Sequence, residues 1–347
     1  MSKQIERKNK KQIVPVFFAA DENYMPFLAV TLASLKAQAS DKYAYKIHVL
    51  YTDELCENAS AVKGMETENF SIRFNDISEK IDAITHLMHC RDYYTSAIYF
   101  RLFIPDLFPE YEKAIYLDCD TIALTDVGEL FSIDIGENLI GAVADQAVAA
   151  VGPFREYTKN ALGIDAEKYF NSGVIVMNLK KMRKLNFYGT FCEILRSYEF
   201  IVAPDQDCLN LICQDKVYFY ESGWNKMPIA GKNDGKIHLI HYNLSMKPWH
   251  YSDVLHEEYF WEYASQTPFI EKIKAQKAAF TPEMAKRDET DGERLIALAQ
   301  AEADSPCNYY KTVGYKRRKQ EKKNENEAGR YGFIESFTQS IGSLKAD

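Results

Sequence analysis

Residues 13–38 read IVPVFFAADENYMPFLAVTLASLKAQ, and this stretch decides the fold. Its first eight residues are a continuous apolar run, which is typical of a parallel strand that is buried on both faces. A short polar turn follows, and Pro26 then stands in the first turn of an apolar-periodic segment, which predicts a helix. A buried strand that leads directly into such a helix indicates an α/β protein.

Strands and helices continue to alternate outward from this segment. We predict strands at 45–50 and 70–74, with a helix at 54–67 between them. This order is typical of a doubly wound, Rossmann-like sheet flanked by helices. Further along, the patterns predict strands at 114–117, 139–144, 173–179 and 236–241, and helices at 93–108, 187–197 and 207–213.

The character of the chain changes after about residue 265. Residues 283–303 are charged and have a helical pattern, and 316–327 (KRRKQEKKNENE) form a charge run. Apolar residues then recur at helical spacing through 333–344. We therefore divide the chain into a charged leader at 1–12, an α/β domain at 13–265 and a helical C-terminal extension at 266–347.

Composition and charge exclude several classes of protein. The chain has 347 residues, of which 46% are hydrophobic and 27% charged, so most of it should fold. Its formal net charge of -8 argues against a general nucleic-acid-binding surface. No run of about 18 apolar residues exists, so we predict no membrane-spanning helix. The N-terminal apolar run is too short for a signal peptide, and we interpret it as the first strand.

The cysteines predict a reducing, cytosolic location. There are seven of them, an odd number, and no CxxC pair occurs. Neither a disulfide framework nor a zinc knuckle fits that pattern. The basic run and the apolar stripe within residues 316–344 leave two interpretations open. One is peripheral contact with the inner face of an anionic membrane. The other is a solvated helix that packs on the domain or on a second subunit.

Two acids follow the predicted strand at 114–117. Asp118 and Asp120 are one residue apart, and side chains at that spacing project to the same side of an extended chain. Ligands of open α/β sheets bind at the carboxyl ends of the strands. The pair can therefore form a hard oxygen site for Mg²⁺ or Mn²⁺, with turn capping as the plainer interpretation.

The same residues also fit a rival chemistry. Residues 118–121 (DCDT) match the nucleophile loop of haloacid-dehalogenase-like phosphatases, in which Asp118 would be the nucleophile and Asp120 the general acid. That loop normally follows the first strand of its domain, whereas this pair follows three other predicted strands. The second acidic loop of those phosphatases usually contains Gly-Asp, and this dipeptide is absent from the chain. We therefore keep the phosphatase as a remote alternative.

Six separate stretches resemble glycosyltransferase family 8, and they occur in the family's order over about residues 13–250. This family includes bacterial lipopolysaccharide galactosyl- and glucosyltransferases and the self-glucosylating glycogenins. The matching stretches are FAADENY at 18–24, YFRL at 99–102, YLDCD at 116–120, YFNSGV at 169–174, DQDCLN at 205–210, and HY with KPW within 241–249.

The resemblance implies a GT-A fold for residues 13–265 and a retaining glycosyltransferase. It further implies Mn²⁺ (or Mg²⁺), UDP-glucose or UDP-galactose as the donor of a hexose, and a glycan or glycolipid acceptor. A glycogenin-like self-glucosylating primer and a nucleotide-sugar-binding protein without activity are the alternatives. The sequence distinguishes neither glucose from galactose nor front-face from double displacement.

The resemblance also assigns residues to the nucleotide and the ion. Ala20, Asp21 and Asn23 resemble the uridine pocket. Arg101 resembles the arginine that meets the donor sugar and phosphates. The metal ligands would be Asp118, Asp120 and His241, and the lysine that neutralises the diphosphate would be Lys247.

A second set of residues resembles the donor-sugar site. Asp145 would bind a sugar hydroxyl, and Asn171 with Gly173 would form the loop that meets the sugar. Asp205 and Gln206 would lie beside the anomeric carbon. The chain departs from the family at one position. Many members carry glycine three residues after the metal histidine, where this chain has Leu244.

Overall fold

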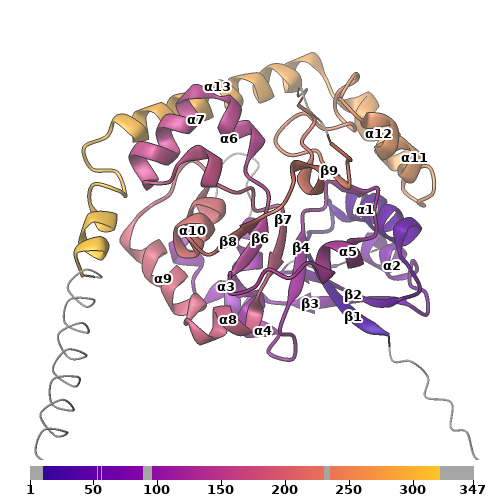
Figure 1. Cartoon of the computed structure of the whole chain (residues 1–347). Helices are drawn as coiled ribbons and strands as arrows, with labels where there is room; N and C mark the ends of the chain where they lie inside the picture. Colours follow the sequence, from indigo (N-terminus) through magenta and orange to yellow (C-terminus); the bar gives the residue numbers. More distant parts are fainter. Residues whose placement is uncertain (1–10, 53, 56, 89–95, 230–234, 321–347) are drawn as a thin grey trace, which may run out of the picture.

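The computed structural model describes residues 11–52, 54–55, 57–88, 96–229 and 235–320. Its centre is a seven-stranded sheet in the order β3-β2-β1-β4-β7-β6-β8, with helices on both faces (Figure 1). These strands are β1 Gln12–Ala19, β2 Tyr43–Tyr51, β3 Phe70–Asp76, β4 Ala114–Leu117, β6 Ile140–Ala142, β7 Val174–Met177 and β8 Val217–Phe219.

The direction of the strands makes the sheet mixed. Strands β3, β2, β1 and β4 are parallel, whereas β7 is antiparallel to both of its neighbours, β4 and β6. The parallel half matches the predicted doubly wound pattern, and the fold class is confirmed. Two strands that the sheet does not include form a separate antiparallel ribbon. They are β5 Thr121–Ala123 and β9 Leu239–His241.

The helices cover the two faces of the sheet and its ends. They are α1 Met25–Gln38, α2 Glu57–Lys63, α3 Ser78–Asp82, α4 Ile104–Leu107, α5 Val127–Ser132, α6 Gln146–Ala150, α7 Gly152–Tyr157, α8 Leu179–Lys184, α9 Phe187–Ser197, α10 Pro204–Cys213, α11 Glu257–Ala264, α12 Ile270–Ala279 and α13 Pro282–Asp304. Shorter turns are η1 Thr85–Leu87, η2 Ser96–Phe103, η3 Thr158–Leu162, η4 Ala166–Lys168 and η5 Ser222–Asn225.

Apolar side chains on the central strands are buried on both faces. In β1, Phe18 belongs to the hydrophobic cluster on one face and Phe17 to the cluster on the other. In β4, Leu117 belongs to the first of these clusters and Tyr116 to the second. The continuous apolar run at 13–20 is therefore explained by a strand with no solvent-facing side, as the sequence predicts.

Two predicted elements differ in detail. Over residues 93–108 the sequence predicts one helix. The described part is a 3₁₀ helix, η2, followed by the single turn α4, and residues 93–95 lie outside the described part. Pro105 fits in the first turn of α4, and no longer helix forms there. The predicted strand at 236–241 is confirmed for its last three residues, which pair with β5 and not with the main sheet.

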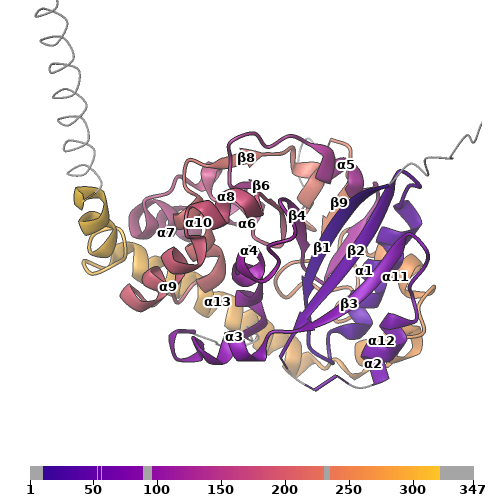
Figure 2. The ribbon, with the colours of Figure 1, turned by 90° about the horizontal axis from the view of Figure 1, so that it is seen from below.

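The C-terminal helices pack onto the α/β domain. α13 contacts α7 and η3, and its residues Leu295 and Ala299 belong to the buried cluster on that side of the sheet. The view from below shows the same arrangement, with α12 on the side of β1–β3 and α7 on the other (Figure 2). The apolar stripe at 333–344 and most of the charge run lie outside the described residues.

None of the helices in the described part of the chain is long and apolar enough to cross a membrane. The five cysteines that the structure describes in detail, Cys119, Cys192, Cys208, Cys213 and Cys307, are unpaired, as the spacing predicts.

Candidate active site

A cavity of about 350 Å³ lies at the carboxyl ends of the central strands. Asp118 and Asp120 enter it because they follow β4 directly. His241 enters it because the β5–β9 ribbon pairs His241 with Thr121, the residue after Asp120. The ribbon therefore brings together acids and an imidazole that are more than a hundred residues apart in the sequence.

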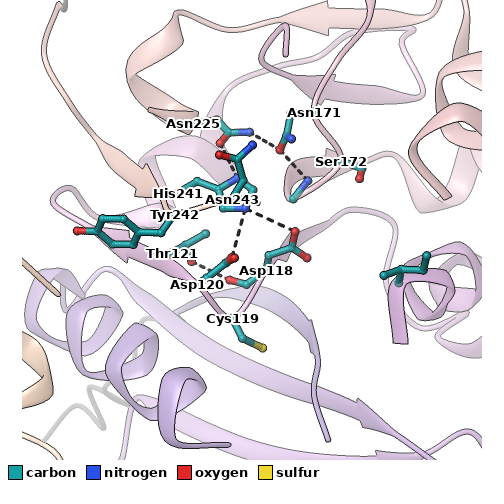
Figure 3. Close-up of polar contacts among 12 residues, drawn as sticks. Asp118, Cys119, Asp120, Thr121, Asn171, Ser172, Asn225, His241, Tyr242 and Asn243 are labelled. Carbon is teal, nitrogen blue, oxygen red and sulfur yellow. Dashed lines mark hydrogen bonds and ion pairs between the residues drawn. The ribbon is translucent and has the colours of Figure 1, made fainter. Parts of the chain in front are cut away.

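The three side chains form a cluster of oxygen and nitrogen ligands. One atom from each of Asp118, Asp120 and His241 lies within 4.8 Å of the others. His241 Nε2 is 3.2 Å from Asp120 Oδ1 and 3.6 Å from Asp118 Oδ2 (Figure 3). Asp120 Oδ1 is buried and makes no hydrogen bond. Because a buried oxygen without a partner is costly, and two carboxylates with an imidazole suit a divalent ion, the residues fit a metal.

Neighbouring side chains hold each of these groups in orientation. Asp118 Oδ1 accepts hydrogen bonds from Arg101 Nη2 at 3.0 Å and from the Tyr116 hydroxyl at 2.9 Å. These bonds leave Oδ2 on the side of His241. On the imidazole, Nδ1 lies 2.9 Å from Asn225 Oδ1. An amide oxygen can only accept, so Nδ1 carries the proton and Nε2 presents its lone pair to the cluster.

Charge keeps Asp120 ionised in its buried position. Burial alone would raise the pKa of this carboxyl, but the Lys247 ammonium beside it outweighs burial and holds the pKa well below its usual range. Lys247 Nζ donates to Asp120 Oδ2 and, at 2.5 Å, to the Tyr242 carbonyl. The cluster therefore has a buried cation beside it even before any ligand binds.

The close packing of the cluster requires glycine at position 173. A Cβ there would lie 2.3 Å from His241 Cε1 and 2.4 Å from Asp118 Oδ2. The backbone takes part as well, since the Asp118 N–H donates to the Gly173 carbonyl at 2.8 Å. The sequence predicts a close approach of this glycine to the donor sugar. In the structure, a side chain at position 173 would instead collide with two of the candidate metal ligands, His241 and Asp118.

Polar side chains line the next part of the cavity. Asp145 caps the N-terminus of α6 and accepts from both Asn171 Nδ2 at 3.1 Å and Gln206 Nε2 at 3.0 Å. Gln206 Oε1 accepts the Ser172 N–H at 2.9 Å. Asn225 Nδ2 donates to Asn171 Oδ1 at 2.9 Å and so joins this network to His241. Three of the five predicted donor-sugar residues, Asp145, Asn171 and Gln206, therefore lie together.

Arg101 is buried among these groups. Its guanidinium donates to Asp118 and to the Ser172 carbonyl at 2.7 Å, lies 3.4 Å from Asp205 Oδ2, and stacks over Tyr116. Burial raises the pKa of Asp205 to about 6, with Asp118 adding to the rise and Arg101 opposing it. Arg101 lines the cavity, but it also positions Asp118 and Asp205.

The predicted uridine residues are only partly at the cavity. Ala20 and Asp21 line it, together with Tyr24, which lies in the same stretch at 18–24 and has no predicted role. Asp21 Oδ1 accepts the Tyr24 N–H at 2.9 Å, as a residue in a helix N-terminal turn does. Asn23 is exposed and is not among the described residues that line the cavity.

Other residues in or next to the cavity are also absent from the sequence prediction. Tyr116 and Ser172 lie inside stretches that the resemblance covers, so their positions could have been read from it. His250 follows the KPW stretch directly. Asn225 and Asp288 lie in segments with no recognisable motif, and only the fold brings them to the site.

Leu244 occupies the position where many relatives carry glycine, and its backbone is left-handed with a φ of 57°. This conformation costs a residue with a Cβ roughly 1–2 kcal/mol, while glycine adopts it freely. We predict that Leu244→Gly is more stable than Leu244→Ala by about 1 kcal/mol, because the alanine keeps the strain. Urea unfolding of the two variants measures the difference. An alanine variant at least as stable as the glycine variant would contradict this account of the loop.

Asp207 predicts a pH dependence of stability. Burial raises the pKa of this carboxyl to about 7, although the hydroxyls of Tyr169 and Tyr157 donate to it at 2.7 Å. The unfolded chain releases the same proton near pH 4. Between these values the folded protein binds a proton that the unfolded chain lacks, so the stabilisation is full at low pH and is lost as the pH rises through 7.

We therefore expect Asp207→Asn to remove this part of the pH dependence. The free energy of unfolding of the natural protein, relative to the variant, should fall by up to about 4 kcal/mol between about pH 4 and pH 8. Denaturant titrations at several pH values measure it. A difference that stays constant across this range would show that Asp207 does not change its protonation on unfolding.

Comparison with known proteins identifies the family. The model of glycosyl transferase family 8 matches residues 15–253. The chain is 27% identical over 221 residues to general stress protein A of Bacillus subtilis, covering 62% of this chain and 74% of that protein. It is 27% identical over 263 residues to a lipopolysaccharide 1,2-glucosyltransferase of Escherichia coli, covering 70% of this chain and 74% of that protein.

Solved structures agree with the sequence relatives. The galactosyltransferase LgtC, solved with donor and acceptor sugar analogues, superposes with a TM-score of 0.65 at 26% identity, over 76% of this chain and all of that one. The bifunctional glycosyltransferase WbbM superposes with a TM-score of 0.68 at 27% identity and 78% coverage, although this chain spans only 53% of its length. The match over most of the α/β domain, together with these structures, shows that the chain belongs to glycosyltransferase family 8 and has the GT-A fold.

Proposed function

We propose that the protein is a retaining, divalent-metal-dependent hexosyltransferase that uses UDP-glucose or UDP-galactose and a glycan or glycolipid acceptor. The observation that carries this proposal is the cluster of Asp118, Asp120 and His241 with Lys247 beside it. Two carboxylates would repel a diphosphate, so the anion needs a cation between it and them. The nitrogen ligand favours Mn²⁺ over Mg²⁺, which prefers oxygen.

Stabilisation of the negative charge on the leaving diphosphate is the main requirement of the reaction. Cleavage of the bond between sugar and UDP develops negative charge on the diphosphate, and a bound divalent ion supplies electrophilic stabilisation of that charge. Lys247 supplies a second positive charge from its buried position beside Asp120. Arg101 keeps Asp118 oriented, and Asn225 keeps the His241 tautomer, so both ligands are preorganised.

The donor sugar would lie over Asp145, Asn171 and Gln206, with Asp205 deeper beside Arg101. Carboxylate and amide oxygens near the anomeric carbon would stabilise the positive charge that develops on the ring. An acceptor hydroxyl on the same face as the leaving UDP would give retention. Asp21 and Ala20 remain our candidates for the uridine contact, and the roles of these residues remain predictions.

The destination of the sugar tests this function. We expect UDP-[³H]glucose or UDP-[³H]galactose with Mn²⁺ to label an added saccharide acceptor, because the metal, donor-sugar and diphosphate residues are all present. Scintillation counting after separation of protein from glycan measures it. Label on the protein itself would indicate a self-glucosylating primer. Binding of UDP without label and without UDP release would indicate a nucleotide-sugar-binding protein.

We also propose that the enzyme is cytoplasmic and meets its acceptor at the inner face of the membrane. The names of its relatives, among them lipopolysaccharide glucosyltransferases, support a surface glycan as the product. The membrane contact proposed for residues 316–344, self-association, and the division at residue 265 remain predictions. Most of the segment that would make this contact lies outside the described residues.

A further inference from the structure

The helix α13 forms part of the wall of the cavity. It follows the family match, which ends at residue 253. Figure 1 shows α13 running along the top of the molecule from the side of α12 to α7, above the ends of the strands. Two of its residues, Asp288 and Leu295, line the cavity. We call Asp288, Gly292 and Leu295 together the α13 roof.

Both ends of this helix are attached to the α/β domain. Near its start, the Tyr251 hydroxyl donates to Asp288 Oδ2 at 2.8 Å. At its end, Ala299 and Ala303 are buried, and the Tyr198 hydroxyl donates to Glu302 at 2.5 Å. The helix is therefore attached to the α/β domain on both sides of Gly292.

Gly292 lies at the middle of the inward face. Residues 288, 292, 295, 299 and 303 recur at helical spacing, so they share one side of α13. The last three of them are buried against the domain. A Cβ at Gly292, in contrast, would meet no atom within 4 Å. Gly292 is exposed and is not itself among the described residues that line the cavity, but along the helix it lies between Asp288 and Leu295, which both line it.

Glycine within a helix needs an explanation, because it destabilises an exposed helix interior by about 1 kcal/mol relative to alanine. The backbone of α13 is regular there, since Gly292 has no positive φ. Close packing does not require the glycine either, as no neighbour approaches it. The remaining consequence of glycine at this position is the space that it leaves beneath the helix.

We propose that the α13 roof is the acceptor-side wall of the active site, and that the space under Gly292 admits the acceptor saccharide. This inference rests on the proposed function. The proposed donor residues form the opposite wall, at the ends of β4 and β9 and at the start of α10. An acceptor must reach the donor sugar from solvent, and Gly292 is exposed between two residues of the cavity wall.

The chemistry of the roof suits a short saccharide. Asp288 can accept hydrogen bonds from sugar hydroxyls, and Leu295 lines the same cavity as Phe154, whose ring can pack against the apolar face of a pyranose. Asp288 and Leu295 are seven positions apart along the helix, which is a rise of about 10 Å. The wall therefore offers a polar contact at one end and apolar contacts at the other.

Substitutions at Gly292 test the proposal, with methyl glucoside, methyl galactoside and lactose as acceptor probes. We expect Gly292→Phe to raise the KM for the best of these acceptors by about 10-fold or more. The KM for the UDP-sugar and the rate of acceptor-free UDP release should stay within about 2-fold, because the donor wall is untouched. Ala297→Phe is the matched control, because Ala297 is exposed and helical spacing places it on the opposite side of α13. It should transfer sugar like the natural protein.

Three results would overturn the proposal. The first is an acceptor KM that is equal in the Gly292→Phe and Ala297→Phe variants. The second is a parallel loss of acceptor-free UDP release, which would place the donor under the roof. The third is an active natural protein that transfers to none of the probes. Failure of the proposed function has a different signature, since the natural protein would then release no UDP from any UDP-sugar.

Discussion

His241→Ala is expected to lower metal-dependent turnover by about 100-fold or more while the protein stays folded. His241 Nε2 faces both Asp118 and Asp120, so its loss opens a coordination position that water fills. The residual activity should lose its preference for Mn²⁺ over Mg²⁺, because only oxygen ligands remain. Initial rates of UDP release in each metal, with circular dichroism as the check on folding, measure both effects.

His238→Ala is the control for this variant. His238 stacks on Trp224, lies 3.1 Å from Thr125 Oγ1, and is not among the described residues that line the cavity. The three-residue spacing predicts that the two histidines face opposite ways, and the structure confirms it. Its loss should cost about 1–2 kcal/mol of stability and leave the metal preference unchanged. If His238→Ala abolished the Mn²⁺ preference and His241→Ala did not, the ligand assignment would be wrong.

Gly173→Ala is expected to reduce turnover as severely as loss of a ligand. The added methyl group would lie within 2.4 Å of both the His241 ring and the Asp118 carboxylate. Contacts this short force one ligand to move, and the backbone cannot yield freely because Gly173 also accepts the Asp118 N–H. A displacement of about 1 Å in an active site can cost about 100-fold in rate.

Gly152→Ala is the matched control, since a Cβ there meets nothing within 4 Å. We expect it to behave like the natural protein in UDP release. The apparent affinity for Mn²⁺, from titrations of the rate, should weaken in the Gly173 variant alone. A Gly173→Ala protein with unchanged rate and unchanged Mn²⁺ dependence would show that the cluster is looser than its distances indicate.

The sequence predicts an element correctly wherever the residues of that element alone form a recognisable pattern. The apolar run of β1 and the Pro26 start of α1 are local features, and both are confirmed. The pairing of β9 with β5 has no such signal. Strands of three residues are too short to show an alternation of apolar and polar side chains, and β5 and β9 are about 120 residues apart in the sequence. Only the folded chain shows that this ribbon carries His241 to Asp120.

The residues of the candidate site likewise fall into those that the sequence could predict and those that it could not. Side chains inside the family stretches, such as Asp145 and Gln206, could be predicted, and they lie together. Asn225 could not, because its role is to fix the His241 ring through a single hydrogen bond, which leaves no pattern in the sequence. Asp288 belongs to a helix whose many charged residues predict a solvent-exposed position. Tertiary packing nevertheless places Asp288 at the cavity.

The most direct test of the account is UDP release from UDP-glucose and UDP-galactose by the natural protein, with Mn²⁺ and with EDTA. We predict slow release with Mn²⁺ even without an acceptor, because Lys247 and the cluster of Asp118, Asp120 and His241 serve the leaving diphosphate and not the acceptor. Chelation should abolish the release, and Mn²⁺ should restore it. Release at the same rate in EDTA would contradict the central claim that these three side chains act through a divalent ion.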